Sequence, residues 1–264
     1  MRAFAGLGVL LLACVPVFAQ GRGPKPPTGP APKMSDGKPD LSGMWQRPYT
    51  PDMSIGAVNM DGKPYPQENP NQAQGKGKQG GGPKLLPYTA WGAEQWKNYD
   101  AQNGDYTGAC LPFGLMRSIN SPDPLQIMQS ATYVSLLFEQ NTWFHVFPID
   151  ARPHGKGIPT WFGDSVGKWE GDTLVVETVN FNGKTRLDTI GHPHSDQLIL
   201  TERYTRPNLA EIQYEMKVHD PKTYTEDWKN VRRFNLRNDW EIMEYSCEEN
   251  NKSFWEGRIK VPKF

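Results

Sequence analysis

The feature that most constrains this chain is the regular alternation of apolar and polar residues along its second half. The clearest case is the segment 211–219, in which every second residue is apolar: Ile212, Tyr214, Met216 and Val218. Side chains of a β-strand point alternately to the two faces of a sheet. The pattern therefore predicts a strand with one buried face and one face in water, as is typical of antiparallel sheets.

Similar segments follow one another at short intervals, separated by turn residues. The predicted strands cover residues 126–139, 143–149, 173–179, 198–206, 211–219, 228–237 and 240–247. Three pairs of them form predicted hairpins, with turns at residues 140–141, 207–208 and 238–239. No helices alternate with these strands, which disfavours a parallel sheet. About six to eight antiparallel strands favour a mainly β fold with a closed or nearly closed up-and-down barrel, because an open sheet leaves two bare edges.

The first residues of the chain have the pattern of a targeting segment. Residues 1–19 combine a positive charge at Arg2, an apolar middle and a small-residue cleavage site, which predicts a signal peptide. An alternative interpretation is a lipoprotein signal, with a lipid attached to Cys14. Both interpretations predict export, to the periplasm or out of the cell. No segment approaches the roughly 20 apolar residues that cross a bilayer.

Residues 20–86 have an unusual composition. They contain 12 glycines and 12 prolines in 67 positions, with a glycine-rich run at residues 75–82. Such a segment buries little apolar surface, so it predicts a mostly extended, disordered arm, anchored at most by residues 41–45. Thr89 can cap a short helix over residues 90–101. Residues 87–264 are therefore predicted to form a single barrel domain that begins with this helix.

The net charge and the cysteine spacing exclude several classes of function. The chain has 29 basic and 29 acidic side chains, so it lacks the basic surface expected of a nucleic-acid-binding protein. Cys110 and Cys247 are too far apart for a zinc ribbon or a CxxC redox pair. In an oxidising compartment they predict a disulfide, and two separate free thiols are the alternative.

The alternation also places charged side chains inside the predicted barrel. Three charged residues share a face with the apolar residues of their strands: Glu202, Arg232 and Glu244. Arg203, next in sequence to Glu202, points outward and could pair with a neighbouring strand. Buried charges are costly unless paired, so the three form a structural salt-bridge network or contact a ligand. A register error of one residue would instead place all of them in solvent.

Two sequence patterns suggest other chemistry, and each has a simpler explanation. Residues 163–167 match the G-x-S-x-G motif of hydrolases, and Asp188 and His192 or His194 follow in the usual order. That motif needs a turn from strand to helix, whereas a strand follows here, so a serine hydrolase is not predicted. His192 and His194, with His154 and Asp188, could supply metal ligands, but loop histidines usually bond the backbone. No metal or cofactor is expected.

Five segments of the chain carry a resemblance to a known family. They are residues 36–45, 110–112, 163–178, 191–195 and 201–204, and the run GDSVGKWEGDTLVVET is the most specific. Together they resemble a large family of exported bacterial proteins of the acidobacterial type, over essentially the whole mature chain. The resemblance implies a lipocalin-like barrel and export, and it implies no activity. The site candidates that it supplies are Asp164, Trp169, Asp188, His192, His194, Glu202 and Arg203.

These observations predict an exported protein that binds a small, partly apolar molecule in the barrel mouth. Three side chains are expected to form the walls of that site, namely Trp169, Tyr214 and Trp228. The expected polar contacts are Glu202, Arg232 and Glu244. One alternative is a cyclase or isomerase that uses the lumen carboxylates with His192 or His194 as acid and base. The other is an envelope interaction module with a filled, inert barrel, favoured if the lumen is smaller than about 300 Å³.

Overall fold

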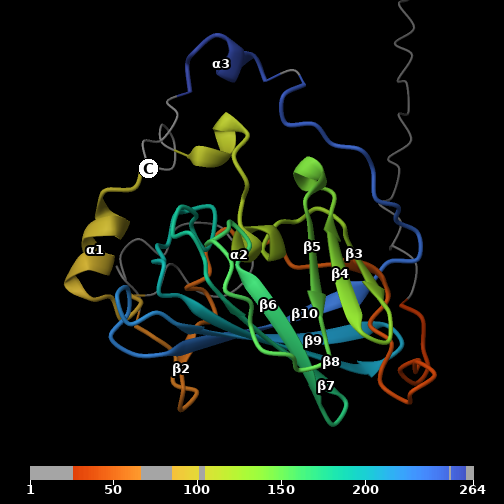
Figure 1. Cartoon of the computed structure of the whole chain (residues 1–264). Coiled ribbons are helices and arrows are strands. Elements are labelled where there is room, and N and C mark those ends of the chain that lie inside the picture. The colour runs from red at the N-terminus through yellow and green to blue at the C-terminus, as the bar shows by residue number, and fades with distance from the viewer. Residues whose placement is uncertain (1–25, 67–84, 101–104, 250, 260–264) are drawn as a thin grey trace, which may run out of the picture.

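A computed structural model describes residues 26–66, 85–100, 105–249 and 251–259 of the chain (Figure 1). The fold is mainly β, with 35% strand against 11% helix, and the predicted class is confirmed. The predicted signal peptide, Cys14 and the glycine-rich run 75–82 lie outside the described residues. None of the helices described is long and apolar enough to cross a membrane.

One antiparallel sheet of ten strands dominates the described part of the chain. Its order is β5-β4-β3-β1-β10-β9-β8-β7-β6, and β2 pairs with β10 beside this path. The strands are β1 (Gly43–Gln46), β2 (Val58–Asn59), β3 (Leu125–Gln129), β4 (Tyr133–Phe138), β5 (Phe144–Pro148), β6 (Asp164–Glu170), β7 (Thr173–Val179), β8 (Ile199–Asn208), β9 (Glu211–His219) and β10 (Trp228–Leu236). The helices are α1 (Ala90–Lys97), α2 (Leu115–Ile119) and α3 (Lys252–Trp255), with short 3-10 helices η1 (Tyr106–Ala109) and η2 (Gln140–Thr142).

The sheet closes on itself where its two end strands, β5 and β6, come together. Side chains and a loop join them: His145 Nε2 lies 2.7 Å from Ser165 Oγ, and the Ala151 amide donates to the Gly167 carbonyl at 3.0 Å. A Cβ atom at Gly167 would lie 2.9 Å from the side chain of Ile149, so the glycine permits this close approach. The barrel is therefore nearly closed, as its length and pattern predict.

The predicted faces of β8, β9 and β10 are confirmed. Of the side chains predicted to point inward, Leu236 at the end of β10 is only partly buried. The others are buried, and they are Leu198, Leu200, Glu202, Tyr204, Ile212, Tyr214, Met216, Val218, Trp228, Arg232 and Phe234. Arg203 points outward as predicted, and its Nη1 donates to Glu170 Oε2 at 3.0 Å. Strand β7 spans residues 173–179 as predicted. The period-two pattern thus gave the correct register on each of these strands.

Two predicted strands are wrong. Residues 126–139 form two strands rather than one, because the chain turns at Ser130, whose Oγ accepts from the Tyr133 amide at 3.0 Å. Residues 240–247 form no strand, so the third predicted hairpin is absent and Glu244 is exposed rather than inside the barrel. The reason is that the open side of β10 is already occupied by β1, with Trp45 opposite Leu236.

The barrel starts earlier in the chain than predicted. Strand β1 comes from the Gly/Pro-rich segment and lies between β3 and β10, so the predicted domain start at residue 87 is wrong. Trp45 and Leu41 are buried in the core, as the predicted anchor requires, and Trp45 Nε1 donates to the Leu41 carbonyl at 3.0 Å. A short apolar segment can therefore complete a sheet when its neighbours supply the hydrogen bonds.

Helix α1 begins where predicted, because Thr89 Oγ1 accepts from the Gly92 amide at 3.1 Å, and it ends before Asn98. Helix α2 was not predicted. All five of its residues are buried, and it lies across one end of the barrel (Figure 1). The core therefore continues from the strands into this helix.

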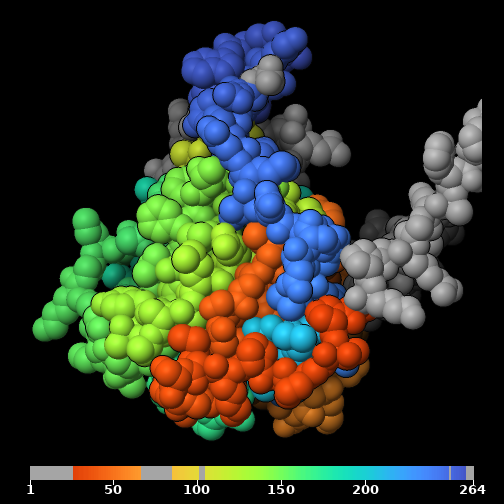
Figure 2. Space-filling model, turned by 90° about the vertical axis from the view of Figure 1, so that its right-hand side faces the viewer, coloured from red at the N-terminus to blue at the C-terminus, as the bar shows by residue number. Residues whose placement is uncertain are grey.

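The segment after β10 crosses the outside of the molecule (Figure 2). It runs beside the N-terminal segment and the β3–β5 region, where the Met243 amide donates to Glu139 Oε2 at 2.9 Å. The predicted disulfide between Cys110 and Cys247 is confirmed, and it fastens this segment to the end of η1.

Candidate functional site

The barrel interior contains the predicted carboxylate Glu202, held by two phenols. The hydroxyls of Tyr204 and Tyr214 both donate to Glu202 Oε1 at 2.8 Å. Burial raises the pKa of Glu202 to about 7, and the two tyrosine hydrogen bonds oppose that shift. The group is therefore partly neutral at physiological pH and is bonded to donors that carry no charge.

Arg232 is also inside the barrel, but Glu202 is not its partner. Its Nη1 donates to Asn120 Oδ1. Among the described residues the predicted salt-bridge network of Glu202, Arg232 and Glu244 is absent, since Glu202 bonds tyrosines and Glu244 is exposed.

The predicted walls of the lumen pack against other core side chains. Tyr214 and Trp228 are fully buried. The Tyr214 ring stacks on Phe234 with centroids 5.0 Å apart, and Trp228 meets Tyr224 edge to face at 5.6 Å. Trp169 is partly buried, and the ammonium of Lys38 lies 5.9 Å from its ring centre. Aromatic side chains therefore occupy much of the space between the strands.

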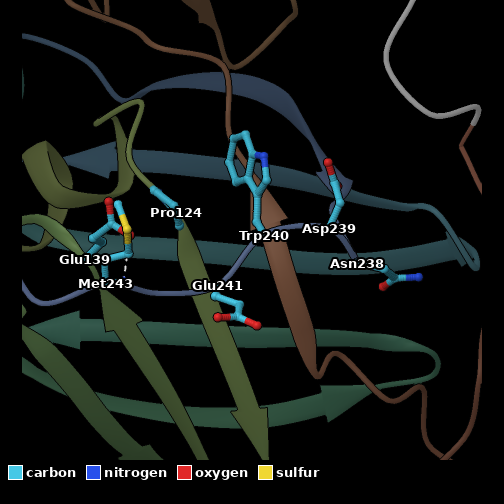
Figure 3. A pocket seen from close by; sticks show the side chains of 7 residues that line it. All are labelled: Pro124, Glu139, Asn238, Asp239, Trp240, Glu241 and Met243. Atoms are coloured by element: carbon cyan, nitrogen blue, oxygen red, sulfur yellow. Dashed lines mark hydrogen bonds between the residues drawn. The ribbon is translucent and has the colours of Figure 1, made fainter.

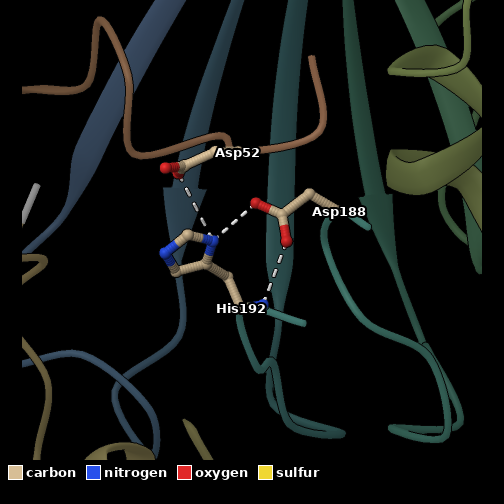
Figure 4. A group of neighbouring side chains, drawn as sticks. All are labelled: Asp52, Asp188 and His192. Atoms are coloured by element: carbon tan, nitrogen blue, oxygen red, sulfur yellow. Dashed lines mark hydrogen bonds and ion pairs between the residues drawn. The ribbon is translucent and has the colours of Figure 1, made fainter. Parts of the chain in front are cut away.

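Asp188 and His192 lie together on the loop between β7 and β8, with Asp52 beside them (Figure 4). His192 Nδ1 is 2.5 Å from Asp188 Oδ2 and 3.8 Å from Asp52 Oδ1. The His192 ring stacks on Trp96 of α1, with centroids 4.4 Å apart and planes 4° from parallel. Sequence reasoning missed Asp52 because it lies far from His192 along the chain.

The hydrogen bonds of Asp188 show what this cluster does. Besides His192 Nδ1, its carboxylate accepts from the backbone amides of Met53 at 2.6 Å, Gly191 at 2.9 Å and His192 at 3.0 Å. Burial opposes ionisation of Asp188, but His192 and these amides lower its pKa below the ordinary value. The ionised carboxylate therefore joins the loop that carries residues 188–192 to residues 52–53.

The same cluster has the ligand types of a metal site, since the nearest ligand atoms of Asp52, Asp188 and His192 lie within 4.8 Å of one another. It could also serve as an acid–base pair, because a carboxylate on Nδ1 orients the imidazole. However, His192 is only 1% exposed and Asp188 already accepts four hydrogen bonds. The hydrogen bonds of the cluster therefore connect the β7–β8 loop to residues 52–53.

His194 and Ser165 belong to neither cluster. His194 Nε2 is 2.5 Å from Thr185 Oγ1, and its Nδ1 is 3.0 Å from the Ser195 carbonyl. Burial lowers the pKa of His194, which favours the neutral ring. Ser165 Oγ contacts His145 and Thr178 in the seam between β5 and β6 rather than a histidine of the β7–β8 loop. Ser165 is therefore bonded neither to His192 nor to His194.

A groove lies on the outer wall of the barrel, between β6–β8 and the loop of residues 150–160. Its volume is about 360 Å³. It is lined by Ala151, Arg152, His154, Val166, Gly167, Lys168, Glu170, Val175, Glu177, Thr201 and Arg203. Val175 on its floor is 5% exposed, whereas Val231, three strands farther along the same outward row, is 46% exposed. The outer face of the barrel around Val175 is therefore covered by the loop of residues 150–160.

Hydrogen bonds hold the loop in this position. The Ala151 amide donates to the Gly167 carbonyl at 3.0 Å, and the Gly155 amide donates to Asp164 Oδ2 at 2.8 Å. Asn180 Nδ2 donates to the Gly157 carbonyl at 2.8 Å. The roof of the groove is thus fastened at several points along its length.

The charged side chains Lys168, Arg203 and Glu177 lie in two neighbouring cross-strand rows of the groove. Lys168 and Arg203 flank Val175 in one cross-strand row, and both contact Glu170, at 3.2 and 3.0 Å. Glu177 lies in the next row, about 7 Å along the strand. His154 completes the second row, because its Nε2 is 3.3 Å from Glu177 Oε1 and its Nδ1 is 3.2 Å from Asp164 Oδ2. One end of the groove therefore carries two cations and the carboxylate of Glu170, whereas the other end carries the carboxylates of Glu177 and Asp164 beside His154.

Of the sequence candidates, the structure places Arg203 in this groove and Asp164 under its roof. Sequence reasoning missed Lys168, Glu170 and Glu177 as site residues. All three lie in the motif 163–178, on its outward face, so the alternation of that motif was the available signal.

A second and larger hollow, of about 630 Å³, lies beside the segment after β10 (Figure 3). Most of its lining side chains are spread along that segment, and Pro124 and Glu139 come from the ends of β3 and β4. The Arg237 guanidinium covers the Trp240 ring at 4.1 Å. The hollow therefore offers no convergent set of polar groups.

No protein-family model, curated protein sequence or solved structure matches this chain significantly.

Proposed function

We propose that the protein binds a small zwitterionic molecule, a free amino acid or a dipeptide, in the outer groove. The observation that carries this proposal is a roofed groove in which one row offers the cations Lys168 and Arg203 and the next offers Glu177. A volume of about 360 Å³ lies within the range of small-ligand sites.

The spacing of the rows supports this class of ligand. The two rows are about 7 Å apart along the strands. An α-amino acid holds its ammonium and carboxylate about 3 Å apart, and a hydrogen bond at each end extends the span to about 8 Å. The carboxylate would contact Arg203 and Lys168, and the ammonium would contact Glu177. Aliphatic atoms of Val166 and Val175 form the floor.

This site differs from the one that the sequence predicts, in the barrel mouth. Much of the interior is occupied by packed aromatic side chains, whereas the groove is open to solvent and has charged groups of both signs. A lumen site and an acid–base enzyme remain predictions. Asp188 and His192 are buried, so this carboxylate–imidazole pair is not accessible to a substrate from solvent.

We also propose that the protein is exported, as its first 19 residues and the resemblance to exported bacterial proteins predict. The disulfide between Cys110 and Cys247 supports an oxidising compartment. Residence in the periplasm or outside the cell is part of this proposal.

Calorimetric titration of the purified protein with the standard amino acids and simple dipeptides tests the groove. We expect saturable binding that is lost when either the ligand carboxylate is esterified or its amine is acetylated. Arg203→Ala should weaken binding about tenfold, because it removes a charged hydrogen-bond donor. Glu177→Gln should weaken binding of the free amine, and acetylating the amine should then cause no further loss of affinity.

Arg233→Ala is the matched control, since Arg233 is an outward arginine on β10, away from the groove lining. Its affinity should equal that of the unchanged protein. Lack of binding by every zwitterion tested, or equal losses in Arg203→Ala and Arg233→Ala, would refute the proposal.

A further inference from the structure

Two buried arginines inside the barrel have few partners. Arg47, just after β1, is 2% exposed and Arg232 on β10 is 8% exposed. Both contact the segment at the C-terminal end of α2: Arg47 donates to the Ser118 and Asp123 carbonyls, and Arg232 donates to Asn120 Oδ1. The partners of both guanidiniums are thus neutral groups.

Each of the two guanidiniums has one nitrogen without a hydrogen-bond partner in the part of the chain that the structure describes. A guanidinium carries five N–H donors. Within the described residues, Arg47 Nε and Arg232 Nη2 are buried and make no hydrogen bond. Buried donors in folded proteins nearly always have a hydrogen-bond partner, so these two nitrogens could accommodate an acceptor.

Their charge is also not balanced by an adjacent carboxylate. Among the described residues, no carboxylate oxygen lies within 4.0 Å of either guanidinium. The carboxylates that act on them from farther away, Asp123 and Asp188, already accept hydrogen bonds from other groups. Glu202 bonds Tyr204 and Tyr214 instead. A buried charge without a close partner costs several kcal/mol.

Both arginines keep their charge at neutral pH. Burial lowers the pKa of Arg47 and of Arg232 to about 10, and this still leaves each protonated. The two charges act on the same phenol, because each guanidinium lowers the pKa of Tyr214 while burial raises it. The two arginines are also neighbours in the fold. Arg47 bonds the Ser118 carbonyl and Arg232 bonds the Asn120 side chain, and Gln46, next to Arg47, lies opposite Asn235 on the strand that carries Arg232.

We propose that the barrel binds one small monovalent anion, a halide or a carboxylate group, between Arg47 and Arg232. The free donors Arg47 Nε and Arg232 Nη2 would hold it, and its charge would offset the two guanidiniums. The surrounding core is closely packed, with Phe234 and Tyr214 fully buried, which favours a small anion over a large one. This site is separate from the outer groove, which is lined by other residues.

Crystals grown or soaked in sodium bromide test the proposal directly. We expect an anomalous scattering peak within hydrogen-bond distance of Arg232 Nη2. A parallel soak in sodium formate distinguishes a carboxylate from a halide at the same position. Only water at this position in both soaks would overturn the proposal.

Thermal unfolding in sodium chloride, with sodium gluconate holding the ionic strength constant, is the second measurement. The melting temperature should rise by about 3–5 °C for each tenfold increase in chloride above its dissociation constant. Arg232→Met should abolish this dependence, while Arg233→Met, its outward neighbour on β10, should retain it.

If Arg232→Met fails to fold, Arg232→Lys keeps the charge and removes the second donor, and it should shift the dependence to higher chloride. The same melting temperature in chloride, formate and gluconate for the unchanged protein would contradict the proposal, as would a chloride dependence that survives in Arg232→Met.

Discussion

Glu202 and Asp188 are both almost completely removed from solvent, yet their pKa values move in opposite directions. Burial raises the pKa of Glu202 to about 7. Burial also opposes the charge on Asp188, but the His192 imidazole and backbone amides lower its pKa below the ordinary value. Burial alone therefore does not decide whether a carboxylate in this barrel is ionised.

The difference lies in the donors. Glu202 has two phenols, and both donate to the same oxygen. Asp188 uses both oxygens, with three backbone amides and an imidazole as donors. Backbone amides are held in place by the chain, so they stabilise the anion without further ordering. We infer that Asp188 fastens the loops at the barrel end as an anion, whereas Glu202 is accommodated in the core close to neutrality.

The largest effect expected from this comparison is that of Asp188→Ala. Removing one partner of a buried, hydrogen-bonded pair costs about 3–5 kcal/mol, because it leaves three backbone amides and His192 without their acceptor. Urea denaturation at pH 7 should show a loss in the free energy of unfolding of that size.

Asp196→Ala is the control for this variant. Asp196 lies on the same loop, but its side chain is 62% exposed and pairs with the exposed Lys222. Its removal should leave stability essentially unchanged. A similar, small loss in both variants would show that the Asp188 cluster does not fasten the loops.

The second prediction concerns pH and Glu202. A carboxyl group whose pKa rises on folding stabilises the protein fully below its ordinary pKa of 4.5, and that stability is lost as pH rises through the folded value of about 7. The loss is about 3 kcal/mol, at 1.36 kcal/mol for each pKa unit. Glu202→Gln cannot ionise, so its stability relative to the unchanged protein should rise by that amount between pH 4.5 and pH 8.

Unfolding free energies measured at several pH values would test this. The carboxylate of Glu215 on β9 faces outward, so Glu215→Gln is the control. Its free energy of unfolding should change with pH between 4.5 and 8 as that of the unchanged protein does. If the curves of Glu202→Gln and the unchanged protein run parallel, the raised pKa of Glu202 is refuted.

The sequence predicts most of the barrel because alternation directly reports burial. Ile212 and Tyr214 lie inside as their spacing requires, and the same logic places Glu202 and Arg232 correctly. The alternation does not predict β1, because a strand of four residues is too short to show a recognisable period. It fails for residues 240–247 because their alternation is real, but the neighbouring strand position belongs to β1.

The candidate sites could be predicted only in part, because a strand pattern fixes the face of a residue and not its partners. The contact of Asp52 with His192 joins loops that are 140 residues apart. The loop at residues 150–160 has no periodic pattern, so its position over Lys168 and Glu177 could not be anticipated. Glu202 was assigned to the interior correctly, but nothing in the alternation favours tyrosines over Arg232 as its partners.

The smallest effect is expected from Tyr214→Phe, which removes one of the two donors to Glu202. The pKa of Glu202 should rise further above about 7, because one hydrogen bond that favours the anion is lost. The free energy of unfolding at pH 8 should fall by roughly 1.5 kcal/mol, as for a hydrogen bond to a charged group.

The control is Tyr224→Phe, which removes a buried phenol that donates to the Pro193 carbonyl. It should lower the free energy of unfolding by a similar amount without changing the pKa of Glu202. Carboxyl carbon NMR of the two variants separates these effects. A Glu202 titration unchanged in Tyr214→Phe would mean that the tyrosines do not control its charge, and the contrast with Asp188 would then rest on burial depth instead of donors.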